Sequence, residues 1–433
     1  MYGDNMYRQL EKELMNWKNR KHKPLILSGA RQTGKTYLVK HFSESYSHSI
    51  YINFERNLDL KEALSQTANP DDIISLLKLY YPSINFNSKD LLIIFDEVQA
   101  CPMILTAIKF LSEETTYDYI LTGSLLGIAI NHTNSYPVGY IESLHMLPMS
   151  FQEFLIALDI SEDQINILKE HFNSGKPLLK SIHEKYLEYF KTYIVVGGMP
   201  EVVQTYVDTK DIASCRKIQN TILEGYYRDM AKYAESSNKI KTHDCFNSIP
   251  LQLSKENKKF QYKLIQSGGN ARFYETSLQW LKDSGTIMYC HRLKCIDTPI
   301  QAYKEASIFK IYLSDTGLLM AMFDDDSATK ILTNNLGIYK GAIYENIAAQ
   351  MLYANNHDLL YFEPSTRSEI DFLYIKNGDI LPIEIKSSDN TRSKSLNAYI
   401  EKYKPKKAYR FSTKNINIEG DIQSYPIYML MFL

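Results

Sequence analysis

The sequence predicts an α/β fold whose first part is a layered parallel sheet, and two patterns indicate it. Short apolar runs occur at residues 24–28, 50–54, 91–95 and 119–122, and helical patterns lie between them. Strands of a parallel sheet are covered on both faces, so they show continuous rather than alternating hydrophobicity. Because strands that alternate with helices pack as a sheet between helical layers, we expect these runs to form one parallel sheet.

The length of the chain indicates several domains. A chain of 433 residues is too long for one hydrophobic core, and its length predicts about three domains. Residues 1–149 hold the expected sheet and an N-terminal amphipathic helix, and residues 150–240 follow a helical pattern. Residues 241–325 show three short helices and then a β-hairpin, which is the order of a winged helix. Residues 326–433 mix helices and strands, so we expect a small αβ domain there.

The composition is that of an ordinary soluble protein, with 44% hydrophobic residues, 23% charged residues and a net charge of -1. No apolar run reaches the roughly 18 residues needed to span a bilayer, so the sequence predicts a cytoplasmic protein with no membrane partner. The five cysteines lack the paired spacing of a zinc site. We therefore expect them to be reduced thiols.

A glycine-rich segment after the first apolar run fits the phosphate-loop pattern GxxxxGK[ST]. A strand pattern precedes it and a helical pattern follows, as the motif requires. Its backbone N–H groups and the helix N-terminus would cradle phosphate oxygens, with Lys35 reaching the β and γ phosphates and the Thr36 hydroxyl ligating magnesium. The expected ATP-binding residues are Gly29, Ala30, Arg31, Gln32, Thr33, Gly34, Lys35 and Thr36.

Two further strand ends carry polar side chains. The apolar run at 91–95 ends in Asp96 and Glu97, at the carboxyl end of a strand, where α/β sheets bind ligands. Asp96 suits the magnesium shell, and Glu97 can orient or deprotonate the attacking water. Ser124 follows the next buried strand and can contact the γ-phosphate or the water. A helix cap and a strand-terminating turn are the alternative interpretations of these two signals.

A hairpin near the C-terminus places acidic residues together. Asn377-Gly378 between two strand patterns is a strong hairpin signal, and this turn sets Asp371 opposite Glu384. Opposed carboxylates repel unless a cation lies between them, and their oxygens suit magnesium or manganese. Lys386, diagonal to Asp371, could stabilise a pentavalent phosphate or position a water. The expected metal and catalytic residues are Asp371, Glu384, Lys386 and, from the preceding helix, Glu345.

An alternative interpretation of the hairpin is a solvated strand face with an ion pair between Glu369 and Lys386. Two observations favour the metal site. The opposite face of the hairpin is wholly apolar, which fixes the register, and a basic stretch that suits a phosphodiester substrate begins beside it. The basic residues are Lys386, Arg392, Lys394, Lys402, Lys404, Lys406, Lys407 and Arg410.

Together these motifs resemble, across nearly the whole chain, the prokaryotic AAA-type ATPases that carry a C-terminal domain of unknown function related to PD-(D/E)XK nucleases. The resemblance implies an ATPase core, a helical lid, a winged helix and a small restriction-endonuclease-like αβ domain, in this order. The matching stretches are Gly29 to Thr36, Phe95 to Gln99, Leu121 to Ser124, Pro148 to Phe154, Gly197 to Pro200, Tyr312 to Leu318, Glu369 to Asp371 and Glu384 to Lys386.

The resemblance also implies roles for single residues. Asp371, Glu384 and Lys386 occupy the PD-(D/E)XK positions, and Glu345 occupies that of the helix carboxylate before them. At one position the chain departs from the family, because it has Tyr140 after a glycine where the family tends to have arginine. The arginine finger is therefore not identified.

Two functions are compatible with the sequence. The first is an ATP-driven enzyme whose C-terminal domain binds or cuts DNA with a divalent metal, as the carboxylates and the lysine of the hairpin favour. The second is an ATP-dependent switch or scaffold whose nuclease-like domain is non-catalytic and binds a protein partner. Glu275 and Asp283 in the expected recognition helix of the winged helix favour the second, because acidic residues oppose phosphate contact. The oligomeric state stays open.

Overall fold

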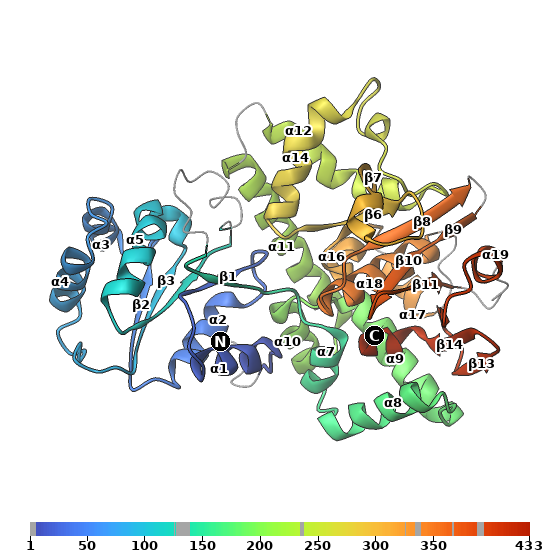
Figure 1. The fold of residues 1–433 in the computed structure, drawn as a ribbon, viewed down its shortest axis with the longest axis horizontal. Helices are drawn as coiled ribbons and strands as arrows, with labels where there is room; N and C mark the ends of the chain where they lie inside the picture. Colours follow the sequence, from blue (N-terminus) through green and yellow to red (C-terminus); the bar gives the residue numbers. More distant parts are fainter. Residues whose placement is uncertain are drawn as a thin grey trace. The chain divides into compact units, whose positions relative to one another are not determined.

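The chain divides into two units, which are described separately. The computed structural model describes residues 6–124, 126, 139–233, 238–324, 326–333, 339–365, 368–387 and 394–433, so Arg392 of the basic stretch lies outside the described residues. The N-terminal unit runs to Leu147 and includes Asp283–Gly285. The C-terminal unit comprises Pro148–Lys282 and Thr286–Leu433 (Figure 1). None of the helices in these described ranges is long and apolar enough to cross a membrane.

The N-terminal unit contains the predicted parallel sheet. Its strand order is β2-β3-β4-β1-β5, and every neighbouring pair is parallel. The four apolar runs of the sequence lie at β1 to β4, and β3 is buried at every residue. The polar edge strand β5 was not predicted, because it alternates half-buried and exposed residues. The strands are β1 (Leu25–Ser28), β2 (His48–Asn53), β3 (Leu91–Asp96), β4 (Asp118–Thr122) and β5 (Glu142–His145).

Helices cover both faces of this sheet (Figure 1). Alternate residues of a strand point to opposite faces, so Ile93 and Phe95 pack under α3, α4 and α5, whereas Leu92 and Ile94 pack under α1 and α2. The parallel strands and the helices on both faces confirm the layered α/β fold that continuous hydrophobicity predicted. The helices are α1 (Leu10–Lys18), α2 (Lys35–Ser43), α3 (Leu58–Leu64), α4 (Pro70–Tyr80) and α5 (Pro102–Glu114), with a short η1 at Val98–Ala100.

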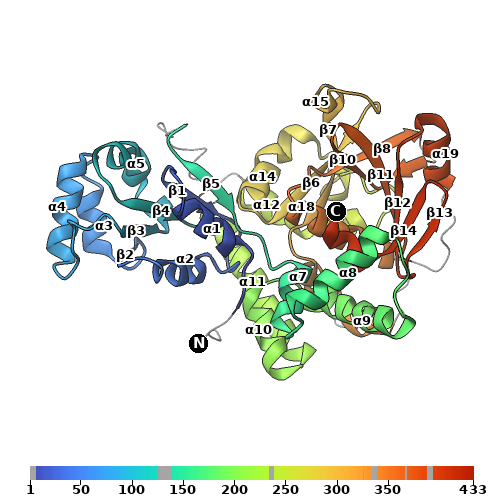
Figure 2. The ribbon, with the colours of Figure 1, turned by 60° about the horizontal axis from the view of Figure 1, so that its bottom comes forward.

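The C-terminal unit begins with helices, as the pattern at residues 150–240 predicts. Ser150 caps the first of them, since its hydroxyl accepts from the Glu153 N–H while the Glu153 carboxylate accepts from the Ser150 N–H. A lid function for these helices stays a prediction. They are α7 (Phe151–Ala157), α8 (Glu162–Ser174), α9 (Lys180–Val196), α10 (Pro200–Thr209) and α11 (Ile212–Tyr233), gathered in green in Figure 2.

The turn between α9 and α10 packs closely on a buried aspartate. The Gly198 N–H donates to Asp315 Oδ2 at 2.6 Å, and a Cβ on Gly197 would lie 2.3 Å from Asp315 Oδ1. Burial raises the pKa of Asp315 to about 6. Residue 197 must therefore be glycine, because the stretch Gly197 to Pro200 packs closely there against the stretch Tyr312 to Leu318.

The expected winged-helix segment is continuous with the C-terminal region. Strands β6 and β7 form the predicted antiparallel hairpin, but β6 also pairs in parallel with β8. One sheet of order β7-β6-β8-β9 thus extends across the boundary predicted at residue 325, because β8 uses the free edge of the hairpin. A winged helix stays a prediction. The elements are α12 (Lys239–Asn247), α13 (Ile249–Leu253), η2 (Tyr262–Leu264), α14 (Ala271–Asp283), β6 (Ile287–Leu293), α15 (Ile300–Tyr303), β7 (Lys304–Leu313), β8 (Leu360–Ser365) and β9 (Ser368–Ile370).

A second sheet of the C-terminal unit has the order β10-β11-β12-β14-β13 (Figure 2). Its hairpin pairs Phe372 with Ile383 and Lys376 with Asp379, which confirms the register predicted from the Asn-Gly turn. The remaining elements are α16 (Thr316–Ala321), α17 (Ser327–Leu332), α18 (Lys340–Ala354), β10 (Phe372–Lys376), β11 (Asp379–Ile385), α19 (Lys394–Tyr403), β12 (Ala408–Ser412), β13 (Asn417–Glu419), β14 (Ile422–Pro426) and η3 (Ile427–Phe432).

Candidate functional site

The phosphate loop connects β1 to the N-terminus of α2. Gly29 and Gly34 both have positive φ, at 144° and 95°, a region that side chains disfavour. A Cβ on Gly29 would lie 2.2 Å from the Met146 carbonyl oxygen, so the loop and the end of β5 approach as closely as glycine allows. The first turn of α2 follows Gly34 directly, and its free N–H groups make this end suited to anions.

Lys35 is buried beneath the loop. Its ammonium donates to the carbonyl oxygens of Gly29 at 2.8 Å and of Ala30 at 2.7 Å. Burial lowers its pKa to about 8, against the opposing charges of Glu97 and Asp96. A phosphate anion would supply the strong negative partner that this buried amine lacks.

Asp96, at the end of β3, contacts the hydroxyl of Thr36, the other residue expected to ligate magnesium. Thr36 Oγ1 donates to Asp96 Oδ2 at 3.2 Å, and Asn53 Nδ2 donates to the same oxygen at 3.1 Å. Tyr51 also donates to it. A hydroxyl beside a fixed carboxylate is a donor set that magnesium accepts. These residues therefore fit a magnesium ion held by Thr36 and Asp96.

Glu97 is held in a strained backbone conformation. Its φ is 54°, a left-handed value that costs a non-glycine residue of the order of 1 kcal/mol and that concentrates at functional sites. Glu97 Oε2 accepts from Gln99 Nε2 at 2.5 Å and lies 3.5 Å from the Ser124 hydroxyl. The ends of β3 and β4 thus bring Glu97 and Ser124 together, as expected.

Several residues of this site were not predicted from the sequence. Gln99 orients Glu97 through its side-chain N–H. A Cβ on Gly123 would lie 2.1 Å from the side-chain amide oxygen of Gln99. Arg8 is buried, and it donates to the Thr33 carbonyl oxygen at 2.7 Å, which holds the phosphate loop in place. The one sequence signal for Gln99 is its place in the stretch Phe95 to Gln99. Tyr140 is exposed, with the Lys109 ammonium 4.4 Å from its ring centre, and offers no substitute for an arginine finger.

Comparisons with known proteins agree with this geometry. Residues 21–155 match the family model of an AAA domain. The match supports an ATPase domain of the AAA and P-loop type. Residues 187–329 and 340–430 match two domains of unknown function, DUF8612 and DUF4143. No curated protein matches the chain in sequence.

Several solved structures are similar to this chain at TM-scores below 0.5. A Walker-type ATPase of Pyrococcus abyssi is 14% identical, with 74% of this chain and 96% of that chain covered and a TM-score of 0.47. Cdc6p of Pyrobaculum aerophilum is 11% identical, with 78% and 97% covered and a TM-score of 0.26. AMPPCP-bound DnaA of Aquifex aeolicus is 13% identical, with 64% and 86% covered and a TM-score of 0.26. Because these TM-scores are all below 0.5, the similarities support no conclusion about function.

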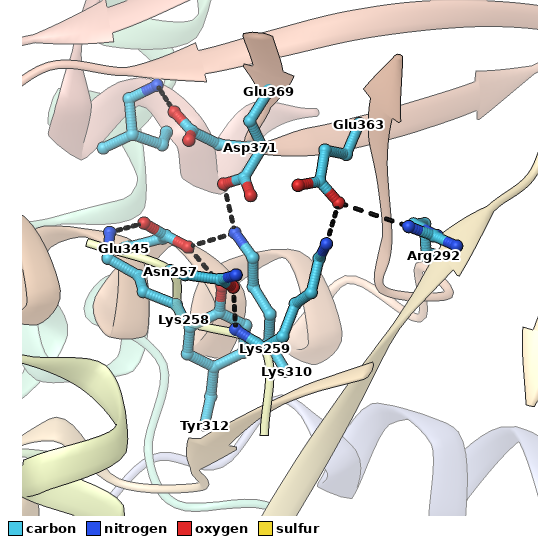
Figure 3. A network of polar contacts seen from close by, with 11 residues as sticks. Asn257, Lys258, Lys259, Arg292, Lys310, Tyr312, Glu345, Glu363, Glu369 and Asp371 are labelled. Carbon is cyan, nitrogen blue, oxygen red and sulfur yellow. Dashed lines mark hydrogen bonds and ion pairs between the residues drawn. The ribbon is translucent and has the colours of Figure 1, made fainter. Parts of the chain in front are cut away.

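A second cluster of charges lies in the C-terminal unit (Figure 3). Carboxylate oxygens of Glu345 on α18, Glu369 on β9 and Asp371 lie within 4.8 Å of one another. Lys310 on β7 reaches into this group, with its ammonium 2.9 Å from Glu345 Oε1 and 2.5 Å from Glu369 Oε1. Lys258 also pairs with Glu345. These contacts join side chains of β7, β9 and α18 into one network. We call it the carboxylate–lysine cluster, and its members are Lys258, Lys310, Glu345, Glu369 and Asp371.

The two lysines compensate the carboxylates electrostatically. Burial raises the pKa of Glu345, but Lys258 and Lys310 outweigh it and lower that pKa to about 2. Burial lowers the pKa of Lys310, but the charges of Glu345, Glu369 and Asp371 raise it well above its usual value. Burial, and then the charge of Glu345, raise the pKa of Asp371 to about 7. The ammonium groups of Lys258 and Lys310 thus offset the negative charge of Glu345 inside the fold.

The predicted metal set of Glu345, Asp371 and Glu384 is not brought together. Glu369 takes the place of Glu384 in the cluster. The strand breaks at Asp371: β9 before it pairs with β8, whereas β10 after it pairs with β11. Glu384 instead pairs with Lys386 at 2.7 Å, and Asp371 Oδ2 accepts from the Ile385 N–H at 2.8 Å.

Lys310 decides whether the cluster fits a divalent ion. Its ammonium lies within hydrogen-bonding distance of two of the three carboxylates. The charge of this fully buried ammonium already offsets two of the carboxylates that would have to bind a divalent ion. The residues of the carboxylate–lysine cluster therefore do not fit a resident magnesium or manganese ion.

Proposed function

We propose that the N-terminal unit binds ATP with magnesium and hydrolyses it. Lys35 and the loop N–H groups bind the phosphates, Thr36 and Asp96 hold the ion, and Glu97 takes the proton of the attacking water. The observation that carries this proposal is the contact of Glu97 with Ser124 next to the pair of Thr36 and Asp96. It supports a hydrolysing site rather than a passive nucleotide pocket, because a positioned base stands beside the expected metal ligands.

The pH dependence of ATP affinity tests the role of Lys35. The free protein has a Lys35 pKa of about 8, and bound phosphate would raise it. Affinity is therefore full below pH 8 and is expected to fall as pH rises above 8, by up to roughly tenfold per pH unit. Titration calorimetry over this range would measure it. Lys35→Arg is the control, because arginine stays charged over this range, so the ATP affinity of the variant should not fall above pH 8. A wild-type affinity that does not change with pH would count against the assignment.

For the C-terminal unit we propose that the nuclease-like region binds nucleic acid without cutting it, and that nucleotide state controls this binding. Lys310 in the carboxylate–lysine cluster supports the non-cutting role, and the basic stretch supports contact with phosphates. A protein partner at the expected winged helix is the second candidate. The acidic residues Glu275 and Asp283 of α14 favour it.

We expect no cleavage of labelled DNA or RNA by the purified chain with ATP and either magnesium or manganese. The reason is that the Lys310 ammonium already pairs with two of the three carboxylates of the carboxylate–lysine cluster. Denaturing gel electrophoresis of the labelled strands measures the result. Asp371→Ala serves as the control, because cleavage by the wild type that disappears in this variant would establish a metal-dependent nuclease and defeat the proposal.

A further inference from the structure

The carboxylate of Asp96 is buried and accepts hydrogen bonds unevenly at its two oxygens. Asp96 is 2% exposed. Its Oδ2 accepts from Thr36 Oγ1 at 3.2 Å, from Asn53 Nδ2 at 3.1 Å and from the Tyr51 hydroxyl. Among the residues that the structure describes, its Oδ1 accepts only from the Glu97 N–H, at 3.0 Å. A carboxylate oxygen can accept more than one hydrogen bond, so Oδ1 keeps room for a metal ion or its water.

Tyr51 reaches this carboxylate because of the strand register. Asn53 on β2 is the register partner of Asp96 on β3, and Tyr51 lies two residues before Asn53, on the same face of the sheet. On this face Tyr51 packs against the core beneath α1 and α2. Thr36 lies in the first turn of α2. A strand and a helix thus each supply a hydroxyl that donates to the same oxygen of Asp96.

The aromatic ring of Tyr51 is held as well. The Lys40 ammonium lies 4.2 Å from its ring centre, which is within the range of a cation–π contact. Lys40 is one turn after Thr36, so both side chains lie on the same face of α2. The ring of Tyr51 therefore contacts α2, and its hydroxyl, a donor at neutral pH, is directed to Asp96.

We infer that Tyr51 is a positioning residue for the magnesium site and acts on the ion through Asp96. The inference rests on the ATP site proposed above. The Tyr51 hydroxyl fixes Asp96 Oδ2 beside Thr36, so that the Thr36 hydroxyl donates its proton there and keeps its lone pairs for the ion. Groups that hydrogen-bond to the ligands of a metal change its affinity by roughly 10 to 100-fold. If Tyr51 only satisfied a buried charge, its loss would change stability and not the effect of magnesium.

The strengthening of ATP binding by magnesium tests this role. It is measured as the affinity of a fluorescent ATP analogue with excess magnesium, divided by its affinity with EDTA. Tyr51→Phe keeps the ring and loses the hydroxyl, so we expect this ratio to fall about tenfold. The affinity in EDTA should stay as in the wild type, because Tyr51 contacts no part of the phosphate loop in the described ranges. An unchanged affinity in EDTA also shows that the variant is folded.

Tyr46→Phe is the matched control in the same unit. The Tyr46 hydroxyl also donates to an aspartate, Asp118 Oδ2, at 2.7 Å, and the Lys18 ammonium lies 3.7 Å from its ring centre. Asp118 is the first residue of β4, whereas Asp96 is the last residue of the parallel strand β3. The two aspartates therefore lie at opposite edges of the sheet, and Tyr46→Phe should keep the wild-type ratio.

Asn53→Ser is the second variant if Tyr51→Phe does not fold. It removes another donor to Asp96 Oδ2 and should lower the ratio as well. Equal ratios above one in the wild type and in the folded variant would overturn the inference and leave the proposed magnesium site intact. A ratio of one in the wild type would overturn both, so the two failures are distinguishable.

Discussion

Lys310→Met is expected to destabilise the C-terminal unit by roughly 3 to 5 kcal/mol, the usual cost of removing one partner from a buried ion pair. Lys310 is fully buried and pairs with both Glu345 and Glu369. Its loss leaves Glu369 without the ammonium it contacts, and leaves Glu345 with Lys258 as its ion-pair partner and the Tyr312 hydroxyl as a hydrogen-bond donor. Methionine has a similar length, so packing loss adds little, and the cost is mainly electrostatic.

The chain offers a convenient measurement of this effect. It has two tryptophans, Trp17 in the N-terminal unit and Trp280 on α14 of the C-terminal unit. In a Trp17→Phe background the fluorescence of Trp280 reports urea unfolding of the C-terminal unit. Lys406→Met is the control, because its pair with Asp379 is exposed and worth at most about 1 kcal/mol. Equal stability of the two variants would show that Lys310 does not hold the carboxylate–lysine cluster together.

Glu97→Gln is expected to bind ATP normally but to hydrolyse it roughly a hundredfold more slowly or worse, the usual contribution of a positioned general base. Glutamine keeps the size of the side chain and an oxygen that can accept from Gln99, so the site should keep its shape. It loses the ability to take a proton from water. Binding of a fluorescent ATP analogue and release of phosphate measure the two effects separately.

Glu62→Gln provides the matched control for this variant. Glu62 lies exposed on α3 of the same unit, so the identical chemical change should leave both quantities as in the wild type. Unchanged hydrolysis by Glu97→Gln would remove Glu97 from the mechanism. Loss of ATP binding would instead make Glu97 a binding residue.

The ATP site could be predicted from sequence because its parts are local. The phosphate loop occupies consecutive residues after a strand, and Asp96 and Glu97 directly follow an apolar run. Their meeting point follows from the shared edge of a parallel sheet. Gln99 and Asn53 could not be predicted, because their contacts depend on the turn after β3 and on the pairing of Asn53 with Asp96 between β2 and β3.

The C-terminal cluster was predicted in part, for a related reason. The Asn-Gly turn fixes the hairpin register locally, and the structure has that register. The break at Asp371 has no local signal, because it arises when β9 leaves the hairpin sheet to pair with β8. Lys310 comes from a strand 35 residues before Glu345. Only the three-dimensional pairing of β6 with β8 shows that this lysine lies among the carboxylates.

Magnesium-dependent release of phosphate from ATP by the purified wild-type chain tests the central claim most directly. The arrangement of Lys35, Thr36, Asp96 and Glu97 predicts release that requires magnesium, stops when the ion is chelated, and returns when magnesium is restored. No release at any magnesium concentration, under conditions in which ATP binds, would contradict the claim and reduce the site to a nucleotide pocket.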